Sequence, residues 1–441
     1  MSVLQRVLGF RTIVSTSAGL AFAAVNFLAV LEIRGQAPGI LGPLGIVVAG
    51  ALCLLAAAVF SELNGTLPSA AGIRVWTLRG LGDPFSLTFT LLYLTTILAV
   101  IAADGFVLAA ALQTAIPAVP GVLWILAFLA AALLSNLRGV RTAGLVQDLT
   151  TYALLAVLII VSAIALGAPG AHLPPTPPAW TGDLFGGVAL AVFVFTGFEW
   201  VTPLAEEVRD PKRMPTGLAV SLLLLAVAFG LFALVAARLP GVSSTGLAPQ
   251  LAVGRAALGG AGFWVMLAVT VVTAGTTFNG GFAAASRLVY ALGRTGYLPA
   301  TLGQLSARFV PARALYLLAG VAAALTLVVF ATGRYLVLIN AGATLESAMY
   351  VVAALALLGL RRREAALPRT YRAPGGRIVP IATVVLFGVL GLGAAFTATG
   401  LPLPSVPWTL ILLAILAVAA YGYTRRALRR RSTRVRGAVP S

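Results

Sequence analysis

The residues best suited to chemistry lie at positions 193–207, which read Phe-Val-Phe-Thr-Gly-Phe-Glu-Trp-Val-Thr-Pro-Leu-Ala-Glu-Glu. The stretch before them is apolar enough to enter lipid, yet Gly197, Glu199 and Pro203 fall inside what would be one membrane-spanning helix. Glycine and proline weaken a helix, and an ionised group at bilayer depth is costly unless it faces a cavity or a partner. We therefore predict a broken helix that lines a binding site. The alternative is a kinked helix with Glu199 near the interface.

Composition places this stretch in a membrane protein. Of 441 residues, 60% are hydrophobic and 10% are charged, and the mean hydropathy is +1.02. Apolar runs of about 20 residues, the length that crosses a bilayer, recur along the chain. The net charge of +18 could indicate nucleic acid binding, but the basic residues gather in alternate loops, which is typical of membrane topology.

Twelve spans are predicted, and the basic residues orient them. With a cytoplasmic N-terminus, 26 of the 30 basic residues lie inside. We therefore expect a multi-pass protein of the inner (plasma) membrane with both termini cytoplasmic. The spans are 12–31, 39–60, 84–111, 121–136, 145–167, 184–206, 216–237, 262–290, 312–332, 335–360, 377–399 and 406–424.

Span 1 carries a small, polar-tinged segment, Ser15 to Gly19, at a depth comparable with Gly197 in span 6. Spans 1 and 6 lie five spans apart, and because five is an odd number, these two helices cross the membrane in opposite directions. This predicts an all-α fold of two inverted five-helix repeats with broken helices 1 and 6. The alternative is that the small residues only pack helices. The expected parts are an N-terminus (1–11), a transporter domain (12–424) with repeats at 12–167 and 184–360 and extra helices at 377–424, and a basic tail (425–441).

Both predicted breaks offer backbone groups to a ligand, because N–H and C=O groups that lose helical partners need others. In span 1, the N–H groups near Ser17, Ala18 and Gly19 lie at the positive end of the following half-helix and suit a substrate carboxylate. In span 6, the carbonyls along residues 193–196, with Phe195 and Thr196 among them, suit a substrate ammonium. Together they predict a site for an α-amino acid.

Four motifs resemble those of the amino acid–polyamine–organocation (APC) superfamily of secondary transporters. The resemblance implies an amino acid permease with a five-plus-five inverted repeat and two added helices, in agreement with the span count. The motifs are Glu62 with Pro68-Ser-Ala-Ala-Gly72, Asn136-Leu-Arg138-Gly139-Val-Arg141, Phe195-Thr-Gly197-Phe-Glu199 running on to 205–213, and Ser286-Arg287 through Tyr290 to Gly296 and Pro299.

The resemblance implies a role for Phe193, and at two places this chain differs from the family pattern. It makes Phe193 an aromatic lid over the ligand, the alternative being a Phe that faces lipid or the core. The family usually has a Gly-x-Gly-Ile-Phe-like run in span 1, where this chain reads Ser-Ala-Gly-Leu-Ala-Phe at 17–22. Many proton-coupled relatives place a lysine in helix 5, where this chain has about Leu154, so we expect no lysine-based proton switch.

Three carboxylates lie within predicted spans. We expect Glu199 to hold the inner end of the break by hydrogen bonding and to take a proton during transport. Asp104 and Glu346 are candidates for proton relay, since intramembrane carboxylates are functional by default. The alternative for these two is a hydrogen-bonded clamp between helices.

Span 8 adds Thr276, Thr277, Asn279 and Gly281. Gly281 and its neighbouring glycine open space, and Asn279 could contact the substrate side chain; tight helix packing is the alternative. The two threonines resemble the sodium site of sodium-coupled transporters of this fold. The alternative is that their hydroxyls bond back to their own helix.

We expect a secondary transporter that moves an amino acid by proton coupling or exchange. The Phe-, Gly- and Ala-rich lining favours a neutral substrate, and the alternatives are polyamine or organic-cation transport and sodium symport. A sensor or channel is the alternative of another class. One His and one Cys offer no metal cluster or nucleophile–base pair, so we expect no enzyme, metal or cofactor. The expected partners are the substrate, the bilayer, and H⁺ or Na⁺, without nucleic acid.

Overall fold

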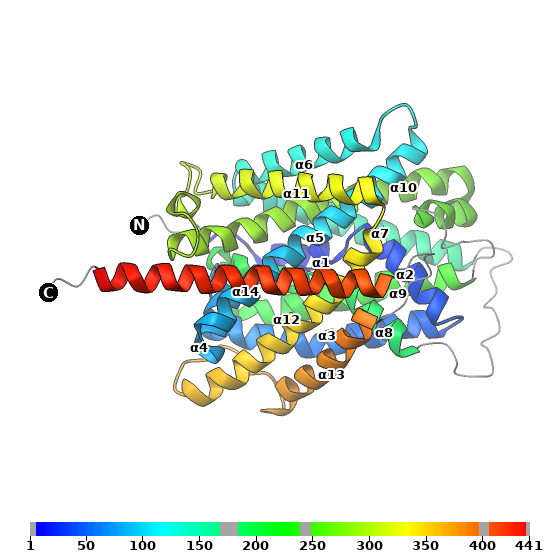
Figure 1. Ribbon diagram of the computed structural model, residues 1–441. Helices are drawn as coiled ribbons and strands as arrows, with labels where there is room; N and C mark the ends of the chain where they lie inside the picture. The colour runs from blue at the N-terminus through cyan, green and yellow to red at the C-terminus, as the bar shows by residue number, and fades with distance from the viewer. Residues whose placement is uncertain (1–5, 168–183, 239–247, 397–404, 438–441) are drawn as a thin grey trace.

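The computed structural model describes residues 6–167, 184–238, 248–396 and 405–437, and these are helical almost throughout (Figure 1). The helices are α1 (Phe10–Ala21), α2 (Val25–Gln36), α3 (Leu41–Thr66), α4 (Gly72–Leu81), α5 (Asp83–Ala115), α6 (Gly121–Leu137), α7 (Val140–Leu166), α8 (Leu184–Phe193), η1 (Phe198–Glu207), η2 (Pro211–Arg213), α9 (Met214–Arg238), α10 (Pro249–Arg294), η3 (Ala300–Gly303), α11 (Ala312–Thr332), α12 (Tyr335–Arg363), α13 (Ile378–Phe396) and α14 (Ser405–Gly437).

The expected multi-pass character is confirmed. Among the described residues, ten segments are long and apolar enough to cross a membrane. The pair α1 and α2 passes the same test together, bent by 57°, and α6 is a shorter apolar helix. The inverted symmetry between the repeats stays a prediction.

Both predicted breaks exist, but the first lies later than expected. The segment Ser17 to Gly19 is inside α1, and the chain leaves the helix only at residues 22–24. Gly19 serves close packing instead, since a Cβ there would clash with the side chains of Gln147 and Thr151 of α7. In the second break, α8 ends at Phe193 and the 3₁₀ helix η1 begins at Phe198. Gly197 between them has a φ of +101°, which a side chain rarely adopts.

The broken span forms the interior of the bundle. In the apolar part of the segment Leu184–Glu207, 83% of the residues are buried, against 11% in the segment Trp408–Arg430 of α14. Helix α1 packs against α7, α9, α10 and η1. Figure 1 shows α6 and α11 along one edge of the bundle and α13 along the opposite edge. The breaks therefore lie where side chains from several helices converge.

Both ends of the described chain lie at one end of the bundle, called here the terminal end (Figure 1). There, the N–H groups of Val7 and Leu8 donate to the Glu207 carbonyl at 2.9 Å, and the Arg209 N–H donates to the Leu8 carbonyl. The Glu207 carboxylate pairs with Arg287 of α10 at 2.8 Å, and both side chains are buried. The start of α1 and the end of η1 are thus joined by hydrogen bonds.

Candidate functional site

The two breaks meet in the bundle interior. The Asn26 amide donates to the carbonyl of Ala21 in the first break (2.6 Å) and to that of Val194 in the second (3.0 Å). The Ser17 hydroxyl donates to the Phe198 carbonyl at 2.6 Å. Side chains from one half of the chain therefore bind backbone freed by the break in the other half.

The carbonyls expected to bind an ammonium are partly engaged within the protein. The Phe193 carbonyl accepts from the Thr196 N–H (3.0 Å), and that of Phe195 accepts from the Phe198 N–H (3.3 Å). Each carbonyl has a second lone pair. The Thr196 hydroxyl is buried and makes no hydrogen bond within the described part of the chain. Polar capacity for a ligand therefore remains at this break.

The backbone N–H groups that the first break leaves without helical partners are those of residues 24 and 25. The carboxylate of Asp104 already faces them. The Val25 N–H, at the start of α2, donates to Asp104 Oδ1 at 2.8 Å, and the Ala24 N–H also faces this carboxylate. Asp104 is fully buried on α5, and its Oδ2 has no hydrogen-bond partner among the described residues. Asp104 thus binds the positive end of the half-helix after the first break, about five residues beyond the predicted carboxylate site at Ser17–Gly19, and this contact fits the clamp alternative.

The threonines of α10 point to different partners. The Thr276 hydroxyl donates to the carbonyl of Thr273 in its own helix at 2.7 Å, as in the plainer alternative. Thr277 faces Asp104, and its hydroxyl satisfies no hydrogen-bond geometry within the described residues. Thr276 therefore makes the back-bond of the plainer alternative, and the sodium site stays a prediction.

Glu199 and Glu346, which are far apart in the sequence, come together. Their carboxyl groups, on η1 and α12 respectively, face each other in the bundle interior. The Tyr93 hydroxyl donates to Glu199 Oε1 (3.2 Å) and that of Tyr350 to Oε2 (3.4 Å). Neither glutamate pairs with a basic side chain in the described part of the chain. We name Glu199 and Glu346 the carboxyl pair.

Phe193 and Phe195, the aromatic residues of the second break, pack against different helices. Phe193 is buried, with its ring edge next to Gly342 of α12. Phe195 points toward Gly50 of α3 and so away from the first break. Both rings therefore pack against neighbouring helices, and the role of Phe193 as a lid stays a prediction.

Asn279 lies on the terminal side of the breaks and is held by the protein. The Asn136 amide donates to the Asn279 carbonyl (2.9 Å) and side-chain oxygen (3.1 Å), and the Asn279 amide donates to Gln147 (3.2 Å). A cavity of about 20 Å³ beside it, close to the size of one water, separates α1 from α7 and α10. Gly281 packs against Ile101 of α5.

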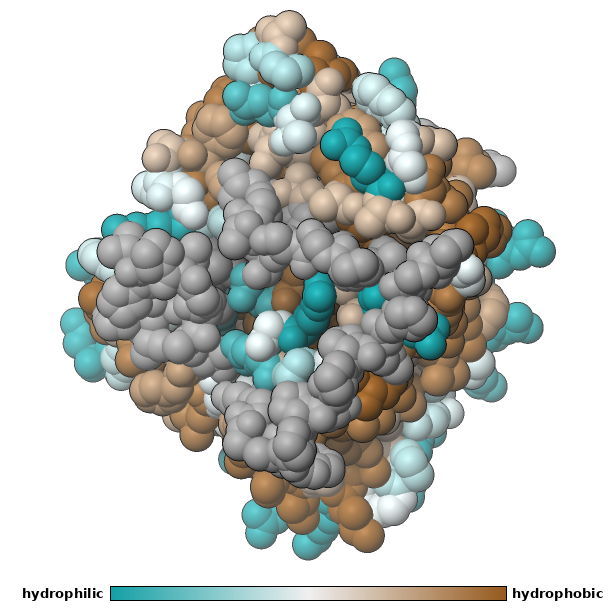
Figure 2. Space-filling view, turned by 90° about the vertical axis from the view of Figure 1, so that its right-hand side faces the viewer, coloured by the Kyte–Doolittle hydropathy of each residue, from teal (hydrophilic) through white to brown (hydrophobic). Residues whose placement is uncertain are grey.

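The same side of the site is closed by α1. The hydroxyls of Thr12 (3.0 Å) and Ser15 both donate to the Asp148 carboxylate of α7. On the face opposite the termini, Figure 2 shows hydrophilic side chains gathered near the centre. In the described conformation, α1 and α7 are therefore held together on the terminal side.

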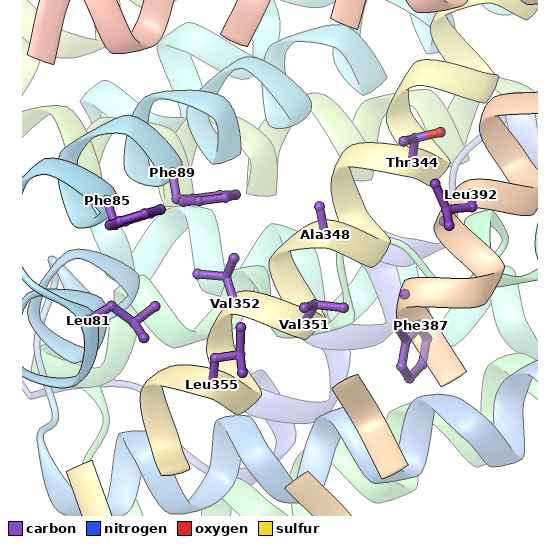
Figure 3. A pocket seen from close by; sticks show the side chains of 12 residues that line it. Leu81, Phe85, Phe89, Thr344, Ala348, Val351, Val352, Leu355, Phe387 and Leu392 are labelled. Atoms are coloured by element: carbon purple, nitrogen blue, oxygen red, sulfur yellow. The ribbon is translucent and has the colours of Figure 1, made fainter. Parts of the chain in front are cut away.

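A separate groove of about 540 Å³ lies between α5, α12 and α13 (Figure 3). Its lining is apolar apart from Thr344, and Phe85, Phe89, Val352 and Leu392 face into it. It offers no charge or donor set for an amino acid. The chemistry of the two breaks, rather than this groove, suits such a ligand.

Several contributors were missed by the sequence reasoning. Asn26 is a polar residue in an apolar run, and that signal could have pointed to it. Tyr93 and Tyr350 carry no such signal, because tyrosines are common in membrane helices. Among the described residues, no group of three or more His, Cys, Asp or Glu could hold a metal ion.

The chain is similar to known permeases over most of its length. Residues 8–420 match the model of the family described as "Amino acid permease". A branched-chain amino acid permease of Lactococcus lactis subsp. cremoris is 31% identical over 310 residues, covering 66% of this chain and 63%, or less than two thirds, of that relative. One from Bacillus subtilis is 25% identical over 85% of this chain and 86% of its own. A low-affinity putrescine importer of Escherichia coli K12 is 27% identical over 42% of this chain and 44% of its own.

Proposed function

Because the chain belongs to the amino acid permease family, we propose that it is a secondary transporter that moves a neutral amino acid across the membrane by alternating access. The single observation that carries this proposal is the meeting of the two helix breaks in the bundle interior, linked by Asn26. Broken helices that face each other provide dipole ends for both charges of a zwitterion.

The proposed topology has twelve spans in two inverted repeats plus two further helices. The basic residues favour an inner-membrane protein whose terminal end is cytoplasmic. In that orientation, the contacts of Asp148 with α1 close the cytoplasmic side. Movement of the joined α1 and η1 away from α7 would open it.

The carboxyl pair supports proton coupling. Two carboxylates in contact repel strongly in a low-dielectric interior, and a hydrogen bond between them requires one proton. Glu199 is on the half-helix that would move, whereas Glu346 is on α12. Separating them would change the affinity for that proton, so proton release or uptake would accompany the change of conformation. Exchange without a proton remains the alternative.

The proposed substrate is a branched, neutral amino acid. The breaks are surrounded by apolar side chains such as Phe193 and Phe22, which suits an aliphatic side chain. Two of the relatives are named branched-chain amino acid permeases. Polyamine transport is a second candidate, since Asp104 is a buried carboxylate and one relative is named a putrescine importer.

Thermal unfolding of the detergent-purified protein with a panel of amino acids and polyamines tests this proposal. A ligand that binds only the folded state at 100 times its Kd adds about 2.7 kcal/mol to the stability. We expect a shift with isoleucine, leucine or valine, and none that depends on Na⁺. A shift with putrescine alone would favour the second candidate. Binding without flux in vesicles would favour a sensor.

A further inference from the structure

The side chain of Asp104 caps the N-terminus of α2, which is the positive end of the helix dipole. Its Oδ1 accepts the Val25 N–H at 2.8 Å, and the Ala24 N–H faces the same group. The first N–H groups of a helix lack internal partners and carry the positive end of its dipole. Within the proposed function, on which this inference rests, these are the donors for the substrate carboxylate.

The substrate and Asp104 cannot use these donors together. A second carboxylate within hydrogen-bonding distance of the Val25 N–H would place its oxygens against those of Asp104. Two like charges in contact in a dry interior repel strongly. The two carboxylates must therefore alternate at the start of α2.

The structure also offers Asp104 a second partner. Thr277 of α10 faces the same carboxylate from another helix. Its hydroxyl and Asp104 Oδ2 are both buried, and neither makes a hydrogen bond of normal geometry in the described part of the chain. A small movement of Asp104 toward α10 would join them and release the N–H groups of residues 24 and 25.

We propose that Asp104 stands in for the substrate carboxylate when the carrier is empty, and that this allows the empty carrier to close and return. An empty site without Asp104 would bury unpaired N–H groups at a helix end, which opposes closure. With Asp104 bound there, closure needs no substrate. The transporter therefore performs net transport rather than obligatory exchange, and Asp104 is a positioning residue that acts through the α2 N-terminus.

Two flux modes of labelled isoleucine in proteoliposomes test the inference: uptake into empty vesicles, and exchange against internal isoleucine. The wild type should show both modes. In Asp104→Ala the ratio of net uptake to exchange should fall at least tenfold, because the empty carrier returns slowly. Asp104→Asn should give an intermediate ratio, since its amide oxygen still accepts from Val25 but lacks the charge.

Thr96→Ala is the matched control on the same helix. Its hydroxyl is buried and, within the described part of the chain, donates only to the carbonyl of Leu92 in α5, at 3.1 Å. The control should keep the wild-type ratio, and thermal unfolding should show that all variants are folded. An unchanged ratio in Asp104→Ala, or a wild type limited to exchange, would overturn the inference while leaving transport intact.

A second measurement distinguishes this inference from the alternative that the substrate is an amine and Asp104 is its counter-ion. If 2-methylbutylamine, which is isoleucine without its carboxylate, stabilises the wild type and isoleucine does not, Asp104 is the counter-ion of an amine and the inference is wrong. Absence of flux in both modes for every amino acid tested would instead overturn the proposed function, and the inference with it.

Discussion

The carboxyl groups of Glu199 and Glu346 face each other although the two residues are 147 positions apart in the chain. The hydroxyls of Tyr93 and Tyr350 bind the Glu199 member, at 3.2 and 3.4 Å. No donor of the described residues reaches Glu346 with normal geometry. A proton between the two carboxyls would satisfy both, and this makes the pair the most direct candidate for a coupling site.

Replacing Glu346 with Gln should uncouple transport from the proton. The amide donates permanently to Glu199, so the pair no longer needs a proton when it forms. We expect isoleucine exchange to become independent of pH between about pH 5 and 8, and a pH gradient to drive at least tenfold less accumulation, both measured in proteoliposomes. Glu364→Gln, at an exposed pair with Arg79, is the control and should behave as the wild type.

Gly197 should not tolerate a side chain. Its φ is +101°, and a Cβ would lie 3.1 Å from the Leu20 carbonyl oxygen across the two breaks. Strain of this kind costs about 1–3 kcal/mol, so Gly197→Ala should lower the unfolding temperature and abolish isoleucine uptake. Gly320→Ala in α11, where a Cβ meets nothing within 4 Å, should be neutral or slightly stabilising. Equal effects of the two substitutions would contradict the assigned geometry.

Replacing only one residue of the buried ion pair Glu207–Arg287 should lower the stability of the protein more than replacing both. Breaking a buried pair leaves an uncompensated charge and costs about 3–5 kcal/mol. Either Glu207→Leu or Arg287→Met should therefore lower the unfolding temperature in detergent more than the double variant does. Additive losses in the double variant would show that the two side chains act independently.

Asp148 should hold α1 against α7. The hydroxyls of Thr12 and Ser15 both donate to it, so Asp148→Ala should loosen the first half-helix. Hydrogen–deuterium exchange is expected to become faster in residues 10–21 and to stay unchanged in α11, which is remote from this contact. Unchanged exchange in α1 would mean that its position does not depend on Asp148.

The sequence predicts much of this architecture. Hydropathy locates the helical segments because the bilayer imposes a length and a polarity on each of them. Gly197 and Pro203 locate the second break, since both residues disfavour a regular helix. The sequence places the first break about five residues too early, because Ser17 and Gly19 look like helix breakers, whereas in the structure Ser17 binds the other break and Gly19 packs against α7.

Pairing across the bundle could not be read from the sequence. Asp104, Glu199 and Glu346 were each identified as intramembrane carboxylates, but no local pattern shows that two of them touch. Nor does any pattern show that Asp104 binds the Val25 N–H, because this contact joins residues 79 positions apart. Such contacts follow from the packing of α2, α5, η1 and α12, which local propensity does not determine.

The central claim is tested most directly by uptake of labelled isoleucine into proteoliposomes under an inward proton gradient. We predict that the wild type accumulates isoleucine above the external concentration, that a protonophore abolishes this accumulation, and that Glu346→Gln equilibrates isoleucine without accumulating it. Accumulation that survives the protonophore, or that is the same in Glu346→Gln, would contradict the account of the carboxyl pair. Absence of uptake for every amino acid in the panel would contradict the proposed transport itself.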